Sequence, residues 1–138
     1  MFKYKLYILI LLAFTRVQLA GAQAHLGSTE FEIKALYPEK KWTVNYTTKA
    51  GIKYISTEMV YGNFLYYFDT ETKLSNLCLQ FPSNNTAMNA QIEAYNKKYV
   101  ITSDRTWTAY LEEGGIMYIS LIYDRENRLS YFKYSNTK

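Results

Sequence analysis

An eight-residue motif that occurs twice constrains the fold of this chain more than any other feature. Residues 68–75 read Phe-Asp-Thr-Glu-Thr-Lys-Leu-Ser, and residues 123–130 read Tyr-Asp-Arg-Glu-Asn-Arg-Leu-Ser. The shared pattern is aromatic-Asp-x-Glu-x-(Lys/Arg)-Leu-Ser, and each copy lies between two strand-like apolar runs. Asp favours turns because its side chain accepts hydrogen bonds from backbone N–H groups just ahead of it. We therefore interpret both copies as hairpin turns and expect an internal duplication.

Hydrophobic periodicity divides each half of the chain into one helix followed by four strands. Thr29 can cap a short first helix, which ends before Pro38 because the residue preceding a proline is disfavoured in the helical region. The run at 51–56 also matches the run at 115–120. Alternating or continuous apolar runs predict strands. These runs cover residues 42–47, 52–58, 64–68, 74–81, 99–102, 107–111, 116–123 and 129–134.

A longer second helix is expected over residues 85–98. Met88, Ile92 and Tyr95 are spaced by four and three residues, so they form one apolar stripe along the helix. Gln91 is expected off that stripe. The predicted fold class is α+β, with an antiparallel sheet, helices packed on one face, and a tandem repeat of helix plus four strands at 28–82 and 83–138.

The first residues resemble a secretory signal peptide. Lys3 and Lys5 precede an apolar run at 6–14, and Ala20-Gly21-Ala22 supplies the small residues of a cleavage site. A retained membrane anchor is the alternative, but the run is far shorter than the roughly 20 residues that span a bilayer. We therefore expect a signal peptide at 1–22, a mobile tail at 23–27, a single domain at 28–138, and a secreted or periplasmic location without stable membrane insertion.

The mature chain is nearly neutral. Removing residues 1–22 lowers the Lys and Arg count from 16 to 13, against 12 Asp and Glu, so the formal net charge falls from +4 to +1. No basic patch remains that would predict nucleic-acid binding. A chain of this size can bury a core without metals or disulfides. Its single Cys, Cys78, alternates with leucines, which indicates a buried apolar role.

Several short motifs are similar to a known fold. Gly27-Ser28-Thr29 with Glu32-Ile33, a proline that ends the first helix, and Tyr66-Tyr67-Phe68-Asp69 resemble the repeat unit of β-lactamase inhibitor proteins and of small outer-membrane assembly lipoproteins. The mature chain also resembles small secreted proteins of Gram-negative bacteria. The resemblance implies a fold and a binding style. Each half has one helix where the inhibitors have a pair, and the lipoprotein cysteine is missing.

Catalytic and cofactor motifs are absent from the sequence. It contains no glycine-rich phosphate loop, no Gly-x-Ser-x-Gly, and no second His or Cys beside His25 and Cys78, so we expect no enzyme activity, no cofactor and no metal. The pairs Asp69 with Glu71 and Asp124 with Glu126 could act as acid and base or bind calcium. We interpret them as solvated turn residues.

Aromatic residues suggest an interaction surface instead. The chain contains 15 Tyr, and aromatic anchors dominate protein interfaces. The candidates for a cluster on the sheet face away from the helices are Trp42, Tyr46, Tyr66, Trp107, Tyr110, Tyr118 and Tyr131. The other interpretation is that most of these side chains fill the core.

Two function classes remain open at this stage. The first is a non-catalytic secreted or periplasmic binding protein, inhibitor-like, with a protein partner. The second is a curved-sheet, cone-shaped fold that encloses a ligand pocket or carries an enzymatic activity. An open sheet with outward aromatic residues favours the first class, and a deep closed pocket favours the second.

Overall fold

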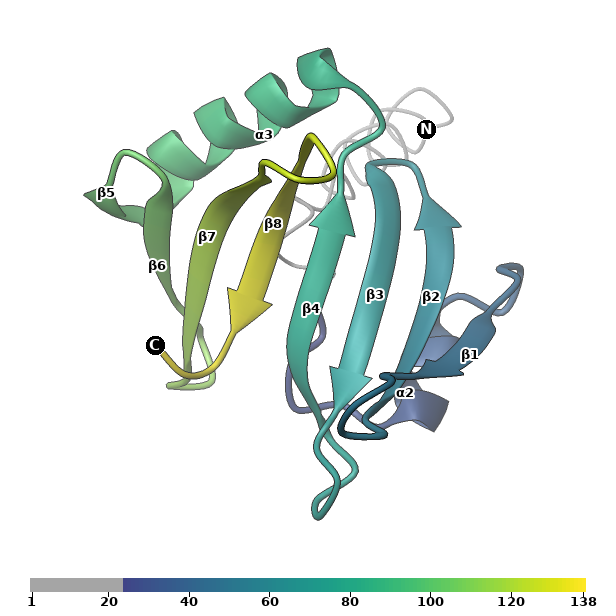
Figure 1. The fold of residues 1–138 in the computed structure, drawn as a ribbon. Helices are drawn as coiled ribbons and strands as arrows, with labels where there is room; N and C mark the ends of the chain where they lie inside the picture. Colours follow the sequence, from purple (N-terminus) through teal and green to yellow (C-terminus); the bar gives the residue numbers. More distant parts are fainter. Residues whose placement is uncertain (1–23) are drawn as a thin grey trace, which may run out of the picture.

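The protein is built on one antiparallel sheet (Figure 1). The computed structural model describes residues 24–138, so the expected signal peptide at 1–22 and Gln23 lie outside the described residues. The helices are α2 (Glu30–Leu36) and α3 (Asn85–Lys98). The strands are β1 (Thr43–Tyr46), β2 (Lys53–Met59), β3 (Gly62–Phe68), β4 (Ser75–Phe81), β5 (Val100–Ser103), β6 (Thr106–Tyr110), β7 (Ile116–Asp124) and β8 (Leu129–Ser135). Every expected element is present, and the expected antiparallel sheet is confirmed.

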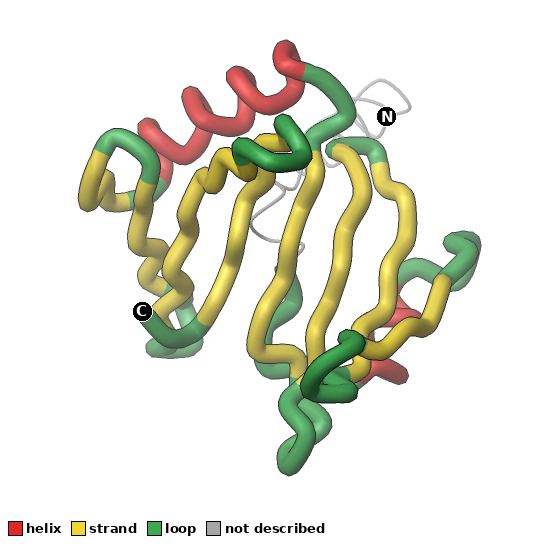
Figure 2. Tube along the Cα trace, in the orientation of Figure 1, coloured by secondary structure: helices red, strands yellow, loops and turns green. Residues whose placement is uncertain are grey.

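The strand order is β1-β2-β3-β4-β8-β7-β6-β5, and all neighbours are antiparallel. Strands β1 to β4 form one meander and β5 to β8 form another, and the two meanders meet where β4 pairs with β8 (Figure 2). The sheet contains far more of the described residues than the two short helices do. The α+β label therefore applies only loosely.

The core lies on one face of this sheet, which we call the helix face. A row of directly paired residues crosses six strands there, and each of its side chains is at most 1% exposed. The row is Ile55, Tyr66, Cys78, Tyr134, Ile119 and Trp107. Burying one large apolar side chain contributes about 1.5–3 kcal/mol. The expectation of a buried, unpaired Cys78 is confirmed.

Helix α3 packs on the helix face through a buried polar network. Asn84 caps its first turn, because its side-chain oxygen accepts a hydrogen bond from the Ala87 N–H at 2.8 Å. Gln91, expected off the buried stripe, is only 5% exposed, so that prediction was wrong. The fully buried member of the expected stripe is Tyr95, while Met88 and Ile92 are partly buried against the core.

The network itself explains why a glutamine is buried at this position. Gln91 Nε2 lies 2.6 Å from Gln80 Oε1, 2.9 Å from the Tyr95 hydroxyl and 3.0 Å from the Tyr134 hydroxyl. Gln80 Nε2 in turn donates to Gln91 Oε1 at 3.0 Å. The two hydroxyls of Tyr95 and Tyr134 are 2.6 Å apart. Burial of polar groups is tolerated here because each of them has a hydrogen-bond partner.

Helix α2 and the residues before it cover the other half of the helix face. Thr29 caps α2 as expected, accepting a hydrogen bond from the Glu32 N–H at 3.1 Å. In place of the expected mobile tail at 23–27, the described residues 24–27 pack against the core. Ala24 is 1% exposed, and His25 Nε2 is 2.6 Å from the Tyr37 hydroxyl. The Gly27 N–H donates to the Ser75 carbonyl at 2.6 Å.

The two copies of the repeated motif form loops with the same hydrogen-bond pattern. Asp69 Oδ1 accepts from the N–H groups of Glu71 and Thr72 at 2.9 and 2.8 Å. Asp124 Oδ1 accepts from the N–H groups of Glu126 and Asn127 at 3.0 and 3.3 Å. The basic residue of each motif is left-handed, with φ of 61° at Lys73 and 54° at Arg128. The predicted turn role of both aspartates is confirmed.

Candidate interaction face

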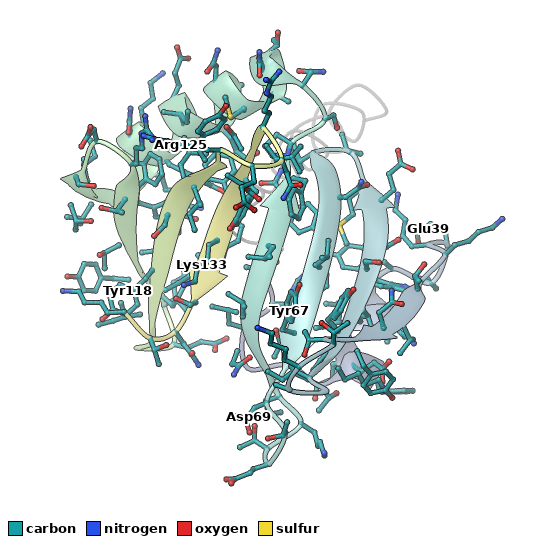
Figure 3. The ribbon with its side chains drawn as sticks, in the orientation of Figure 1. Glu39, Tyr67, Asp69, Tyr118, Arg125 and Lys133 are labelled. Carbon is teal, nitrogen blue, oxygen red and sulfur yellow. The ribbon has the colours of Figure 1, made fainter. Side chains whose placement is uncertain are left out.

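The sheet face opposite the helix face is not crossed by either described helix, and we call it the open face (Figures 1 and 3). Side chains alternate along each strand, so its members follow from the strand register. Its apolar and aromatic members include Tyr54, Leu65, Tyr67, Leu77, Leu79, Phe81, Tyr110, Ile116, Tyr118, Ile122 and Tyr131. Its hydroxyl members include Ser56, Thr106, Thr108, Ser120 and Ser135.

Aromatic side chains pack in pairs across neighbouring strands of the open face. Tyr54 and Tyr67 are stacked, with ring centroids 4.8 Å apart and an angle of 23° between the rings. Phe81 and Tyr131 have ring centroids 5.1 Å apart. Cross-strand aromatic pairs of this kind stabilise a sheet by roughly 0.2–1 kcal/mol each. They also hold the rings in place, so that little side-chain entropy would be lost on binding.

The Tyr67 hydroxyl remains neutral over the physiological pH range. Its partial burial raises its pKa, and the nearby Tyr54 and Tyr131 add to the rise. A neutral phenol can both donate and accept a hydrogen bond. The open face therefore combines apolar ring surface with polar groups that carry no charge.

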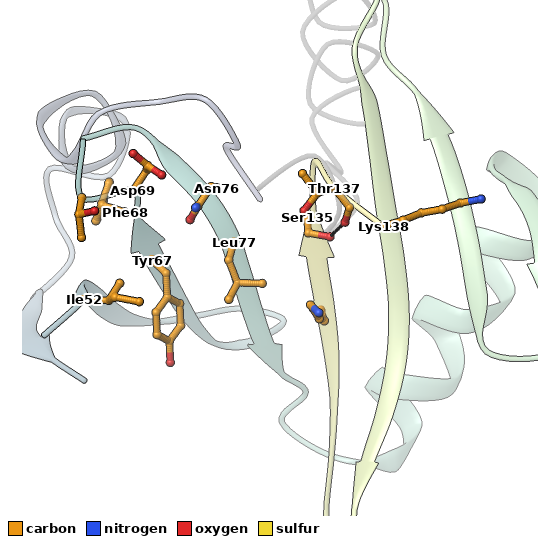
Figure 4. A pocket seen from close by; sticks show the side chains of 11 residues that line it. Ile52, Tyr67, Phe68, Asp69, Asn76, Leu77, Ser135, Thr137 and Lys138 are labelled. Carbon is orange, nitrogen blue, oxygen red and sulfur yellow. Dashed lines mark hydrogen bonds between the residues drawn. The ribbon is translucent and has the colours of Figure 1, made fainter. Parts of the chain in front are cut away.

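Two hollows lie side by side on the open face and share the end of β8. The first, of about 340 Å³, is lined by Tyr67, Leu77 and Asn76 on one side and by Lys133, Ser135 and Thr137 on the other (Figure 4). The second, of about 310 Å³, is lined by residues of β6, β7 and β8. Both hollows open to solvent. The deep closed pocket that a cone-shaped ligand-binding fold requires is not among those found in the part of the chain that the structure describes.

Charged side chains are sparse on the open face. By strand alternation, the charged residues of the described strands on this side are Lys133 near the centre, Glu58 near one end of β2, and Asp124 at the last position of β7. Lys133 is exposed and projects from the middle of the sheet between Tyr67 and Tyr118 (Figure 3). The face therefore has an uncharged aromatic surface with one cation near its centre.

The structure divides the seven aromatic candidates between the core and the surface. Tyr66 and Trp107 are 0% and 1% exposed on the helix face, and Trp42 packs against Tyr37 and Tyr66, so these three belong to the core and correct the prediction. Tyr46 is 62% exposed and lies with Phe31 on a separate groove at the β1 edge. The three candidates that do lie on the open face are Tyr110, Tyr118 and Tyr131.

Sequence reasoning missed Tyr54, Tyr67 and Phe81 on the same face. The signal that could have found them is the alternation of side chains between the two faces of a strand. Tyr67 lies between Tyr66 and Phe68, which are buried, so its side chain points to the opposite face. In β3, however, five consecutive apolar residues occupy both faces, so the sequence does not show which face of the strand is covered. The covered face is decided by where α2 and α3 dock.

The acidic pairs retain their structural interpretation. Backbone N–H groups of Thr72 and Glu71 hold the pKa of Asp69 below its usual value, and hydrogen bonds from Asn127 and Glu126 do the same for Asp124. A carboxylate with a lowered pKa is a poor general acid near neutral pH. Among the described residues, no group of three or more His, Cys, Asp and Glu side chains could hold a metal ion.

Comparison with known proteins finds no relative. The chain matches no protein-family model, no curated protein and no solved structure. Neither α2 nor α3 is long and apolar enough to cross a membrane. The resemblance to β-lactamase inhibitor proteins and assembly lipoproteins stays a prediction from short motifs.

Proposed function

We propose that this protein is a secreted or periplasmic, non-catalytic binding protein, inhibitor-like, whose open face takes a protein partner. The observation that carries the proposal is the composition of that face. Protein interfaces are depleted of charge at their centre and enriched in Tyr, Trp, Phe and Met. The open face has paired aromatic rings, aliphatic side chains and hydroxyls, and Lys133 is its one central charge.

The hydroxyl groups suit the same role. Ser56 and Ser120 lie beside aromatic and aliphatic side chains on this face, where they can form hydrogen bonds to a partner's backbone. Tyr adds a hydroxyl to a large apolar ring at low entropic cost, which is why rigid tyrosines are common binding anchors. Over most of its area the surface would therefore bind through apolar contact and short neutral hydrogen bonds.

The secreted or periplasmic location rests on the N-terminal sequence. A charged start, a short apolar run and the small residues at 20–22 are the pattern of a cleaved signal peptide. Cleavage after Ala22 would leave only Gln23 before Ala24, whose side chain is buried. Intact mass spectrometry of exported protein should give a first residue at or near Gln23. Recovery of uncleaved chain in the membrane fraction would contradict the proposal.

We also infer that the fold arose by duplication of a helix-plus-four-strand unit. The strand order reads the same from both edges of the sheet toward the β4–β8 pair. The Asp69 and Asp124 loops, which have the same hydrogen-bond pattern, lie at opposite ends of the sheet, as a two-fold relation between the halves would place them (Figure 3). Two such units would join into one continuous face, larger than either unit alone offers.

Site-specific photo-crosslinking in cells tests the binding proposal. Replacing Tyr118 with p-benzoylphenylalanine puts the crosslinker on the open face, and replacing Tyr123 puts it on the opposite side of the same strand. We expect one adduct of defined mass from position 118 and none from position 123. Equal adducts at both positions, or none at 118, would refute the open face as the binding surface.

A further inference from the structure

Lys133 is a charged residue with uncharged neighbours near the centre of the open face. Its backbone pairs with Leu79 on β4 and with Ser120 on β7, so both of its cross-strand neighbours are uncharged. Along its own strand, Tyr131 and Ser135 precede and follow it on the same side. The salt bridges of the described residues join Glu30 to Lys34 and Lys53, and none includes Lys133.

Both hollows of the open face are lined by this lysine. The hollow between β6, β7 and β8 has seven hydroxyl side chains and two ammonium groups on its wall, and no Asp or Glu side chain. These residues are Thr102, Thr106, Thr108, Tyr118, Ser120, Ser135, Thr137, Lys133 and Lys138. The neighbouring hollow has the same Lys133 and Lys138, together with Asp69 at its far end. Hydroxyl and ammonium groups are hydrogen-bond donors that suit an anionic oxygen.

A partner that covers the open face would remove water from Lys133. Burying an ammonium group without a counter-charge is strongly unfavourable. The residues that pair with Lys133 on the neighbouring strands include no Asp or Glu that could supply one. Snorkelling to the rim is limited by position, because Lys133 lies on β8, which has four strands of the sheet on one side and three on the other. The compensating charge must then come from the partner.

Resting on the proposed binding function, we infer that the partner of the open face is a protein segment that places an Asp or Glu carboxylate against Lys133. The carboxylate enters the hydroxyl-lined hollow between β6, β7 and β8. Apolar or aromatic residues on either side of the acid contact Tyr118, Tyr131 and Leu79. Lys133 thereby sets the partner's specificity, since a neutral or basic residue at that point would leave the ammonium group unpaired.

Selection from a displayed library of disulfide-closed random peptides tests this inference on the whole purified protein. Peptides directed to the open face are identified as those that lose about tenfold or more in affinity on Tyr118→Ala. Among these peptides we expect an Asp or Glu at one fixed position. Lys133→Met, which keeps much of the apolar stem, should weaken them by about tenfold or more.

Two controls make the result specific to the charge pair. Lys97→Met, on the exposed surface of α3, should leave affinity unchanged. Replacing the peptide's acid by its amide should weaken binding to the wild-type protein but have little further effect on the Lys133→Met variant. Circular dichroism of each variant establishes that it is folded.

The outcomes separate the inference from the function on which it rests. If peptides sensitive to Tyr118→Ala lack an acid and bind Lys133→Met as well as wild type, the acidic anchor is refuted and the binding face stands. If no selected peptide is sensitive to Tyr118→Ala, the open face is not the binding surface, and both proposals fail.

Discussion

Gln91 shows how one residue can couple a helix to a sheet. It joins α3 to Gln80 on β4 and Tyr134 on β8, all of them buried. Gln91→Ala would leave the Gln80 amide and two tyrosine hydroxyls short of partners, so we predict a loss of about 1–3 kcal/mol in the free energy of unfolding. Asn89→Ala, at an exposed position of the same helix, should change it by no more than about 0.5 kcal/mol. Urea titrations that show equal effects would contradict this role.

The repeated aspartates provide a second test at the scale of single residues. Asp69→Ala and Asp124→Ala should lower the urea midpoint to a similar extent, because each carboxylate accepts two backbone hydrogen bonds in its loop. Each folded-state pKa is held below the usual value, so the stabilisation is complete near neutral pH and is lost as the pH falls through that lowered pKa. Both variants should therefore match wild type more closely in acid. Glu71→Ala is the control, and unequal effects of the two Asp changes would argue against equivalent loops.

At the scale of elements, the segment before α2 has a pH-dependent contact. His25 is largely buried beside Tyr37 and Tyr66, and this burial lowers its pKa. Docking of this segment therefore favours the neutral form of His25. The stability of the docked segment is greatest above the ordinary His pKa of about 6.5 and declines as the pH falls below that value. The Gly27 amide, which bonds to Ser75, should lose hydrogen-exchange protection between about pH 7 and 5.

Substitution isolates the histidine as the cause. His25→Phe keeps a ring against Tyr37 and Tyr66 but cannot be protonated, so protection of the Gly27 amide should become independent of pH over that range. Amides of β8, far from this segment in sequence, serve as the internal reference. If the loss of protection is the same in wild type and His25→Phe, protonation of His25 is not responsible.

At the scale of the whole molecule, Cys78 reports on the opening of the sheet. It is 0% exposed between Tyr66 and Tyr134, next to the β4–β8 pair that joins the two meanders, and burial raises its pKa. A thiol reagent attacks the exposed thiolate, so labelling under native conditions should be limited by global unfolding. The labelling rate should rise with urea in parallel with the unfolded fraction. Rapid labelling without denaturant would contradict a central, closed position, and reducing agent alone should leave the thermal midpoint unchanged.

The order of elements could be read from the sequence because the interactions that specify them are local. Capping by Thr29, the break at Pro38 and the two Asp-led turns depend on side chains a few residues from the backbone they contact. Strand alternation likewise needs no knowledge of the rest of the chain. These local signals were sufficient for both helices, all the strands and the antiparallel sheet.

The covered face, and with it the candidate site, was decided only by tertiary structure. Alternation defines two faces of a strand, but β3 and β7 are apolar on both, so Tyr66 and Tyr67 look alike until α2 and α3 dock. Gln91 likewise reads as a surface residue, and only Gln80 and Tyr134, distant in sequence, provide the partners that allow its burial. The central position of Lys133 depends on the pairing of β4 with β8, which no local pattern specifies. Contacts between distant segments set these features, because burial is a property of where elements meet and not of the residues alone.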